Sequence, residues 1–204
     1  MDNREYLKQI SASVRPEKAK KTSFLSSNIF KIIIGAIAAF IVVIIIGNIL
    51  SSGKDSLRNN SFALKLHLDN TLETISEYQK SIKSSDLRSS SASLYSILSN
   101  TNRDLTSYIT EKWNYKEKSV NKNILEEEKL ESDDLNQELF EAKINGILDR
   151  IYAHKMAYEI SLITTRETSL SKGTKDEAFK SLLNSSLTSL NNLYDKFNDF
   201  SETK

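Results

Sequence analysis

The chain has 204 residues, of which 28 are basic and 27 are acidic. This length suits one membrane anchor and one domain, and the balanced charge gives no sign of nucleic-acid binding. The sequence contains no cysteine, which excludes disulfides, thiolate metal sites and a cysteine nucleophile. With one proline and five glycines, the composition favours an all-α protein.

Residues 32–50 form an apolar segment that predicts a transmembrane helix. As a helix the segment would be about 28 Å long, close to the thickness of the hydrocarbon core of a bilayer. Thirteen of its residues are Ile, Val, Leu or Phe, which favours insertion by roughly 4 to 8 kcal/mol. The alternative is a cleaved signal peptide, but its apolar run is usually shorter, and residues 48–51 (NILS) lack a cleavage pattern. We therefore predict a retained signal anchor.

The basic residues around this segment predict its orientation. Arg15, Lys18, Lys20, Lys21 and Lys31 precede the segment, whereas Lys54 and Arg58 follow it closely. The positive-inside rule places the short basic arm of residues 1–31 in the cytoplasm and the C-terminal domain outside. We expect a single-pass protein of the cell membrane, in which residues 51–56 link the anchor to a domain over residues 57–204.

Small residues recur along one face of the predicted anchor. Gly35, Ala39, Val43 and Gly47 follow one another at steps of four. Such a face lets two membrane helices approach closely and predicts a dimer contact. The favoured alternative is that this face reflects only the general abundance of Gly and Ala in membrane helices.

Heptad spacing after residue 56 predicts an antiparallel bundle of about four long helices. Apolar and small residues alternate at steps of four and three over residues 57–82, 87–108 and 179–200. A further helix is expected over about residues 134–170, where Ile144, Leu148, Ile151, Tyr158 and Leu162 make one seam. Tyr152, Met156, Ile160 and Ile163 widen that seam, which is typical of a central helix.

The expected helix boundaries carry turn and capping residues. Residues 83–86 (KSSD) separate the first two helices. Gly173, followed by Thr174 and Glu177, predicts a glycine stop and then a capping box. Residues 114–130 are ambiguous, because they suit a loop, a short helix or an extension of the next helix.

The two histidines do not match a metal motif. Glu-x-x-His pairs hold the di-iron site of some bundles, but Leu64 and Ile151 stand three residues before His67 and His154. We interpret both histidines as residues at the edge of the core that each make an ordinary hydrogen bond. The acidic run over residues 126–134 does not fit a calcium loop and suits a helix start. No metal and no cofactor are expected.

Polar residues on the expected central helix form the one candidate ligand site. Tyr152, Lys155, Glu159 and Arg166 could line a cavity between helices. The favoured alternative is that they set the helix register or reach the surface. Trp113, with Tyr108 and Tyr115, is interpreted as a plug at one end of the bundle. Nucleotide loops and hydrolase motifs are missing from the sequence, so an enzyme is not expected.

Three stretches carry a resemblance to a group of bacterial proteins. They are SFALKLHLDNTLETISEYQ, SSDLRSSSASLYSILSNT and ELFEAKINGILDRIYAHKMAYEISL. In these the chain resembles uncharacterised single-pass helical membrane proteins of host-dependent bacteria of the Saccharibacteria type. The resemblance implies a bacterial cell membrane and a surface-facing domain, and it brings no activity or site residues.

These observations predict a membrane-anchored bundle that acts by binding a protein partner, or copies of itself, in assembly of the cell envelope. The alternative is an accessory sensor that binds a small ligand between the bundle helices. A cavity lined by Tyr152, Lys155 and Glu159 would favour the sensor, and a filled core would favour protein binding.

Overall fold

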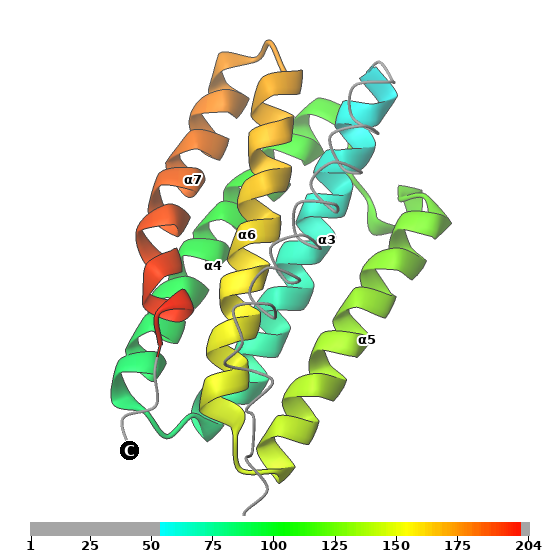
Figure 1. Ribbon diagram of the computed structural model, residues 1–204. Helices are drawn as coiled ribbons and strands as arrows, with labels where there is room; N and C mark the ends of the chain where they lie inside the picture. Colours follow the sequence, from blue (N-terminus) through cyan, green and yellow to red (C-terminus); the bar gives the residue numbers. More distant parts are fainter. Residues whose placement is uncertain (1–53, 201–204) are drawn as a thin grey trace, which may run out of the picture. The chain divides into compact units, whose positions relative to one another are not determined.

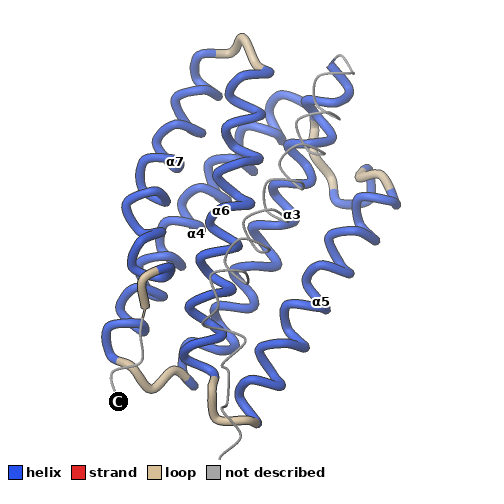
Figure 2. Tube along the Cα trace, in the orientation of Figure 1, coloured by secondary structure: helices blue, strands red, loops and turns tan. Residues whose placement is uncertain are grey.

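The computed structural model describes residues 54–200, and these residues are helical throughout, with short connections and no strand (Figures 1 and 2). The elements in chain order are α3 (Lys54–Tyr78), the 3-10 turn η2 (Gln79–Ser81), α4 (Ser85–Trp113), the 3-10 turn η3 (Glu117–Ser119), α5 (Lys122–Ile144), α6 (Leu148–Gly173) and α7 (Glu177–Asn198). The predicted anchor over residues 32–50 lies outside the described residues. Among residues 54–200, no helix is both long and apolar enough to cross a membrane.

Four of the helices form a closed ring around the core. α3 packs against α4, α4 against α7, α7 against α6, and α6 against α3 (Figure 1). The predicted seams supply the buried side chains of this core. Buried seam residues are Ser61, Leu64, Leu68, Thr71, Ile75 and Tyr78 of α3; Leu87, Ser91, Leu94, Leu98, Thr101 and Leu105 of α4; and Phe179, Leu183, Ser186, Leu190, Leu193 and Phe197 of α7. Because these seam residues are buried, the heptad prediction is confirmed for these three helices. The small Ser and Thr side chains at seam positions let the helices approach closely.

The fifth helix, α5, lies outside this ring against α3 and α6 (Figure 1). The single helix predicted over residues 134–170 is therefore wrong, because the chain reverses direction inside it. α5 ends at Ile144, and Gly146 adopts a φ of 71° before α6 begins at Leu148. A positive φ is easy for glycine and costly for other residues, so Gly146 allows the tight turn. Residues 122–130, ambiguous in the sequence, are the first part of α5.

The polar contacts of α5 give its direction. Tyr78 donates a hydrogen bond to the carbonyl of Asn136 at 3.0 Å, and Asn70 donates to the carbonyl of Glu128 at 3.1 Å. Later residues of α3 thus meet later residues of α5, and the two helices run parallel. The bundle is consequently an antiparallel four-helix ring with one added helix, rather than the four helices expected.

Capping residues explain where two of the helices begin. Ser84 accepts a hydrogen bond from the backbone N–H of Leu87 at the start of α4, as the KSSD turn predicts. At the start of α7 the cap is Asp176, which accepts from the N–H groups of Ala178 and Phe179. The hairpin after Gly173 is confirmed, but the capping box predicted from Thr174 is wrong, since Asp176 holds that position.

Buried Asp149 fixes the turn between α3 and α4. Its carboxylate accepts hydrogen bonds from the backbone N–H of Lys83 at 3.0 and 3.1 Å and from that of Ser84 at 2.7 Å. These bonds satisfy backbone donors that the turn would otherwise leave without a partner in the chain. They also hold the start of α6 against the turn.

Aromatic rings fill the opposite end of the bundle, as predicted for Trp113. The ring of Trp113 lies edge-on to Phe62, Tyr108 and Phe179, with centroids 5.8 to 6.5 Å apart. Tyr115 meets Phe62 at 4.8 Å. These contacts join the start of α3, the end of α4 and the start of α7, and such aromatic pairs stabilise a core beyond their buried area.

Candidate functional site

Five ionisable side chains meet where α5 packs against the ring. His67 comes from α3, Glu128 and Glu131 come from α5, and Glu159 and Arg166 come from α6. We call these five residues the charge network. Glu128 and Glu131 are three residues apart on α5, and Glu159 and Arg166 are seven residues apart on α6. Each pair therefore shares one face of its helix.

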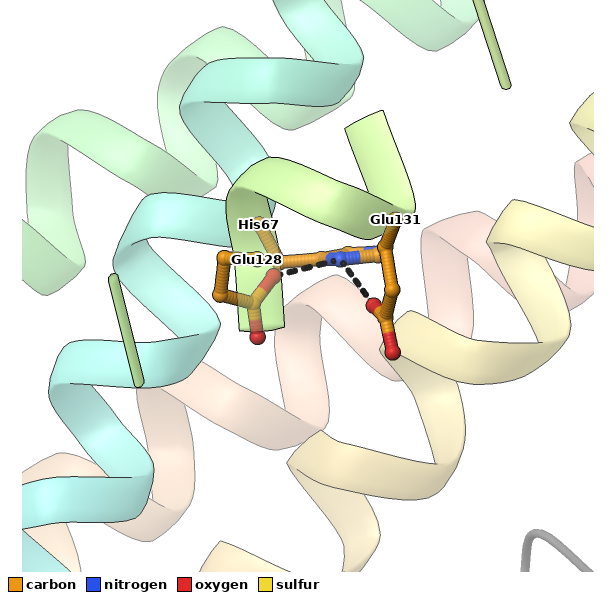
Figure 3. Close-up of side chains that lie close together, drawn as sticks. All are labelled: His67, Glu128 and Glu131. Carbon is orange, nitrogen blue, oxygen red and sulfur yellow. Dashed lines mark hydrogen bonds and ion pairs between the residues drawn. The ribbon is translucent and has the colours of Figure 1, made fainter. Parts of the chain in front are cut away.

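His67 lies at the centre of the charge network. Its Nδ1 is 3.0 Å from Oε2 of Glu128 and 3.6 Å from Oε2 of Glu131, and both carboxylates point at this nitrogen (Figure 3). On the other side of the ring, Nε2 is 2.8 Å from Oε2 of Glu159. That pair is close enough for an ion pair, although its alignment is not that of a hydrogen bond. The side chain of His67 is 5% exposed, so the expected position at the edge of the core is wrong.

The electrostatics of the charge network favour a charged imidazole. Burial and the positive charge of Arg166 both lower the pKa of His67, but the contacts with Glu128 and Glu159 outweigh them and raise it to about 9. Burial alone would raise the pKa of Glu128, yet its contacts with His67 and Arg166 hold it below the ordinary value. Glu128 therefore stabilises the charged forms of His67 and Arg166 and is stabilised by both, whereas the two cations oppose each other.

Arg166 joins the two carboxylates of α5. Its guanidinium pairs with Oε1 of Glu128, and its second terminal nitrogen lies 3.2 Å from Oε2 of Glu131. The Arg166 side chain is 14% exposed, whereas that of Glu131 is 44% exposed. Burial raises the pKa of Glu131, although Arg166 opposes this shift. Glu131 is thus the point at which solvent reaches the network.

The charge network and other polar contacts add to the apolar packing of Leu135, Leu139 and Ala142 in attaching α5 to the ring. Thr74 donates to Oδ1 of Asn136 at 3.2 Å, in addition to the bonds from Asn70 and Tyr78. Removing one partner from a buried ion pair costs about 3 to 5 kcal/mol, because the other charge is left uncompensated. The position of α5 on the ring therefore depends on all members of the network being present.

The polar track predicted on the central helix divides into separate groups. Glu159 and Arg166 belong to the charge network, whereas the hydroxyl of Tyr152 bonds to that of Ser91 at 2.6 Å inside the core. Lys155 pairs with Glu138 of α5 near the surface. Each of these side chains meets a partner within the chain, and a ligand role for them stays a prediction.

The remaining candidates lie apart from the network. His154 is exposed on α6, and the predicted dimer face of Gly35, Ala39, Val43 and Gly47 lies outside the described residues. An open groove of about 460 Å³ lies between the start of α4 and the end of α7. Its lining residues are Asp86, Leu87, Ser89, Ser90, Asp195, Lys196, Asp199 and Phe200.

Sequence reasoning missed the roles of His67, Glu128 and Glu131. A signal was present, since His67, Asn70 and Thr74 recur at steps of three and four beside the main seam of α3. A second polar stripe on a bundle helix indicates a second contact surface. That stripe does not identify the partners of His67, because they lie on other helices. Glu128 is 61 residues after His67 in the sequence, and Glu159 is 92 residues after it.

A further buried carboxyl group, that of Glu167, lies in the core itself. Glu167 follows Ile160 and Ile163 along the inner face of α6 and precedes Leu170, and its exposed fraction is 0%. Neither of its oxygens has a hydrogen bond of normal geometry. Burial raises the pKa of Glu167 to about 8, and the hydroxyl of Ser186 only partly offsets this.

Comparisons with protein-family models, with curated proteins and with solved structures found no match to this chain.

Proposed function

We propose that this protein acts by binding another protein through the outer face of α5, while residues 32–50 anchor it in a bacterial cell membrane with the helical domain outside. The anchor and its orientation are supported by the apolar segment and the basic residues that precede it. In this proposal the domain is a binding component of the cell envelope and not an enzyme.

The observation that carries the proposal is a row of large apolar side chains exposed on α5. Leu130 is 64% exposed, Phe140 is 56% exposed and Ile144 is 68% exposed. Positions 130, 137 and 144 are two turns apart, and Phe140 lies one turn before Ile144, so all three side chains share one face. We call this surface the α5 outer face. Ile144 was expected in the core, but the turn at Gly146 turns it outward.

Charge complementarity points to the chemistry of the occupant. Residues 122–144 contain eight acidic residues and three lysines, which gives α5 a net charge of −5. Glu126, Asp133 and Glu141 are exposed on α5 and flank the apolar row. The best match is an amphipathic helix of a partner protein, with an apolar seam bordered by lysine or arginine.

The exposed apolar area is large enough to matter for binding. Full burial of a large apolar side chain contributes about 1.5 to 3 kcal/mol, so covering these three, already partly buried, would contribute roughly 3 to 5 kcal/mol. That corresponds to an affinity gain of about 10² to 4 × 10³-fold. The steered approach of a basic helix to an acidic surface would add to the association rate.

Among the described residues, no cavity lined by Tyr152, Lys155 and Glu159, which the sensor function would require, is found. Each of these side chains is paired with a residue of a neighbouring helix, and the groove between α4 and α7 does not include them. We therefore propose protein binding alone.

Site-specific photo-crosslinking in the native cell tests the proposal. A photoreactive residue at Gln137, between Leu130 and Phe140, should capture a lysine-rich or arginine-rich amphipathic helix of one partner protein. Replacing Phe140 and Ile144 with Gln should reduce capture by at least about tenfold, because most of the apolar contact is removed. Tyr95→Gln is the matched control, since Tyr95 is 41% exposed on α4 and should leave capture unchanged.

Two outcomes would contradict the proposal. Capture of a second copy of this chain alone would show self-association instead of partner binding. Equal capture by the wild-type protein and the Phe140→Gln, Ile144→Gln variant would show that the α5 outer face is not the binding surface.

A further inference from the structure

Three ligand atoms of the charge network converge at one point. Nδ1 of His67, one oxygen of Glu128 and one oxygen of Glu131 all lie within 4.8 Å of one another. Nδ1 is 3.0 Å from the Glu128 oxygen and 3.6 Å from the Glu131 oxygen. For a tetrahedral zinc ion with bonds of about 2.0 to 2.1 Å, neighbouring ligand atoms lie about 3.3 Å apart. The two distances from Nδ1 therefore bracket the spacing that zinc requires, and the two carboxylate oxygens lie within 4.8 Å of each other.

We propose that His67, Glu128 and Glu131 bind a divalent transition-metal ion of the zinc class, which links α3 to α5. An imidazole nitrogen with two carboxylates suits zinc and its neighbours in the first transition row. Calcium and magnesium prefer sites made of oxygen alone, so they are poor candidates. This inference is independent of what binds to the α5 outer face.

Glu159 supplies the outer support that a metal-binding histidine needs. A histidine that binds metal through one ring nitrogen commonly donates its other N–H to a carboxylate, which fixes the ring. Here Oε2 of Glu159 lies 2.8 Å from Nε2 of His67, and the Glu159 side chain is 8% exposed. The two atoms are close enough for an ion pair but are not aligned for a hydrogen bond, and neither has a hydrogen-bond partner elsewhere among the described residues. The pair is therefore free to serve this supporting role.

The charges around the three ligand atoms also fit a divalent ion. Glu128, Glu131 and Glu159 carry three negative charges and Arg166 carries one positive charge, which leaves −2 when the imidazole is neutral. A divalent cation cancels this charge, and on binding it replaces the proton between Nδ1 and Glu128. Arg166 pairs with Oε1 of Glu128, whereas the oxygen that faces His67 is Oε2. The guanidinium thus leaves free the Glu128 oxygen that the metal would use. It donates at 3.2 Å to Oε2 of Glu131, the oxygen that faces His67, so the metal would share this oxygen with Arg166.

The position of Glu131 allows the metal to enter. The Glu131 side chain is 44% exposed, whereas those of His67 and Glu128 are each 5% exposed, so solvent reaches the three ligands from the side of Glu131. A water molecule can then complete a four-coordinate site, as at zinc sites with three protein ligands.

Zinc binding by the full-length chain in detergent micelles tests the inference. After removal of any affinity tag, the protein is dialysed against micromolar zinc chloride, and bound metal is measured by elemental analysis. One zinc ion per chain is expected, together with a higher melting temperature followed by circular dichroism. Glu131→Gln should weaken zinc binding by at least about tenfold, because loss of a direct ligand exceeds the usual effect of losing an outer one.

Two variants control for binding elsewhere on the chain. His154→Gln removes the second histidine of the chain, which is exposed, and should retain zinc. Glu127→Gln removes an exposed charge of α5 and should also retain it. The inference is overturned if the wild-type chain binds no zinc, or if Glu131→Gln binds it as tightly as the wild type. The wild-type measurement decides this even if a variant fails to fold.

Discussion

Replacing Glu167 with Gln should change how the stability of the domain depends on pH. Glu167 is a carboxyl group in a core position, between Ile163 and Leu170 on α6, with no hydrogen bond of normal geometry. Its burial raises the pKa from an ordinary value of 4.5 to about 8. The folded protein therefore retains a proton over a range of pH in which the unfolded chain has released it.

The sign of the effect follows from proton linkage. Between pH 4.5 and about 8, the folded state binds more protons at this site than the unfolded state, so stability falls as pH rises. The loss is about 1.4 kcal/mol per pH unit and reaches about 5 kcal/mol above pH 8. This is a large part of the 5 to 15 kcal/mol by which folded domains are usually stable. Gln has nearly the same shape and does not titrate, so the variant lacks this loss.

Urea unfolding of the full-length chain in detergent, at several pH values from 5 to 8.5, measures the effect. Fluorescence of Trp113, the one tryptophan in the sequence, reports on the domain, because its ring packs between Phe62 and Phe179. The difference in unfolding free energy between Glu167→Gln and the wild type should grow as pH rises and level off above about pH 8. Comparing two proteins at each pH cancels titration of the other groups.

Parallel stability curves for the two proteins would refute this reasoning, since they would mean that Glu167 titrates alike in the folded and unfolded states. Glu141→Gln provides the matched control. Glu141 is exposed on α5, so its replacement disturbs few contacts and should leave the pH dependence of the wild type in place.

Two further predictions concern the membrane topology and the core. Protease added to intact, wall-stripped cells should digest the chain after Lys54 and spare residues 1–31; protection of the C-terminal domain would overturn the proposed orientation. Leu190→Ala should lower the free energy of unfolding by about 2 to 5 kcal/mol, because Leu190 is fully buried in α7. In the same urea experiment, Asn192→Ala at an exposed neighbouring position should change the free energy of unfolding by less than about 0.5 kcal/mol. Equal losses of stability in the two variants would mean that the seam of α7 was misidentified.

Local pattern predicted the helices whose apolar residues repeat without interruption. In α4 and α7 each seam position from Leu87 to Leu105 and from Phe179 to Phe197 is buried. The reason is that a bundle helix must bury one stripe, and the period of that stripe is a property of the helix alone. The turn at residues 83–86 was also predictable, because a capping side chain acts within three residues of its own position.

The boundary between α5 and α6 was not predictable in the same way. Asn145 and Gly146 lie inside a stretch whose apolar spacing continues across them, so periodicity alone predicts a single helix. The Asn-Gly pair was the available signal, because Gly146 supplies the positive φ of the turn. A single helix across this pair predicts Ile144 in the core, whereas the reversal of the chain puts this side chain at the surface.

By itself, the sequence determined that this chain has an apolar segment long enough to span a membrane and an all-helical domain with a heptad core. These properties depend on segment length and on residue spacing along one helix. Only the tertiary structure decided that α5 packs outside the ring, that His67 meets Glu128 and Glu159, and that the apolar row of α5 faces outward. Such contacts join residues that are far apart in sequence, and they depend on which helices become neighbours when the core is buried.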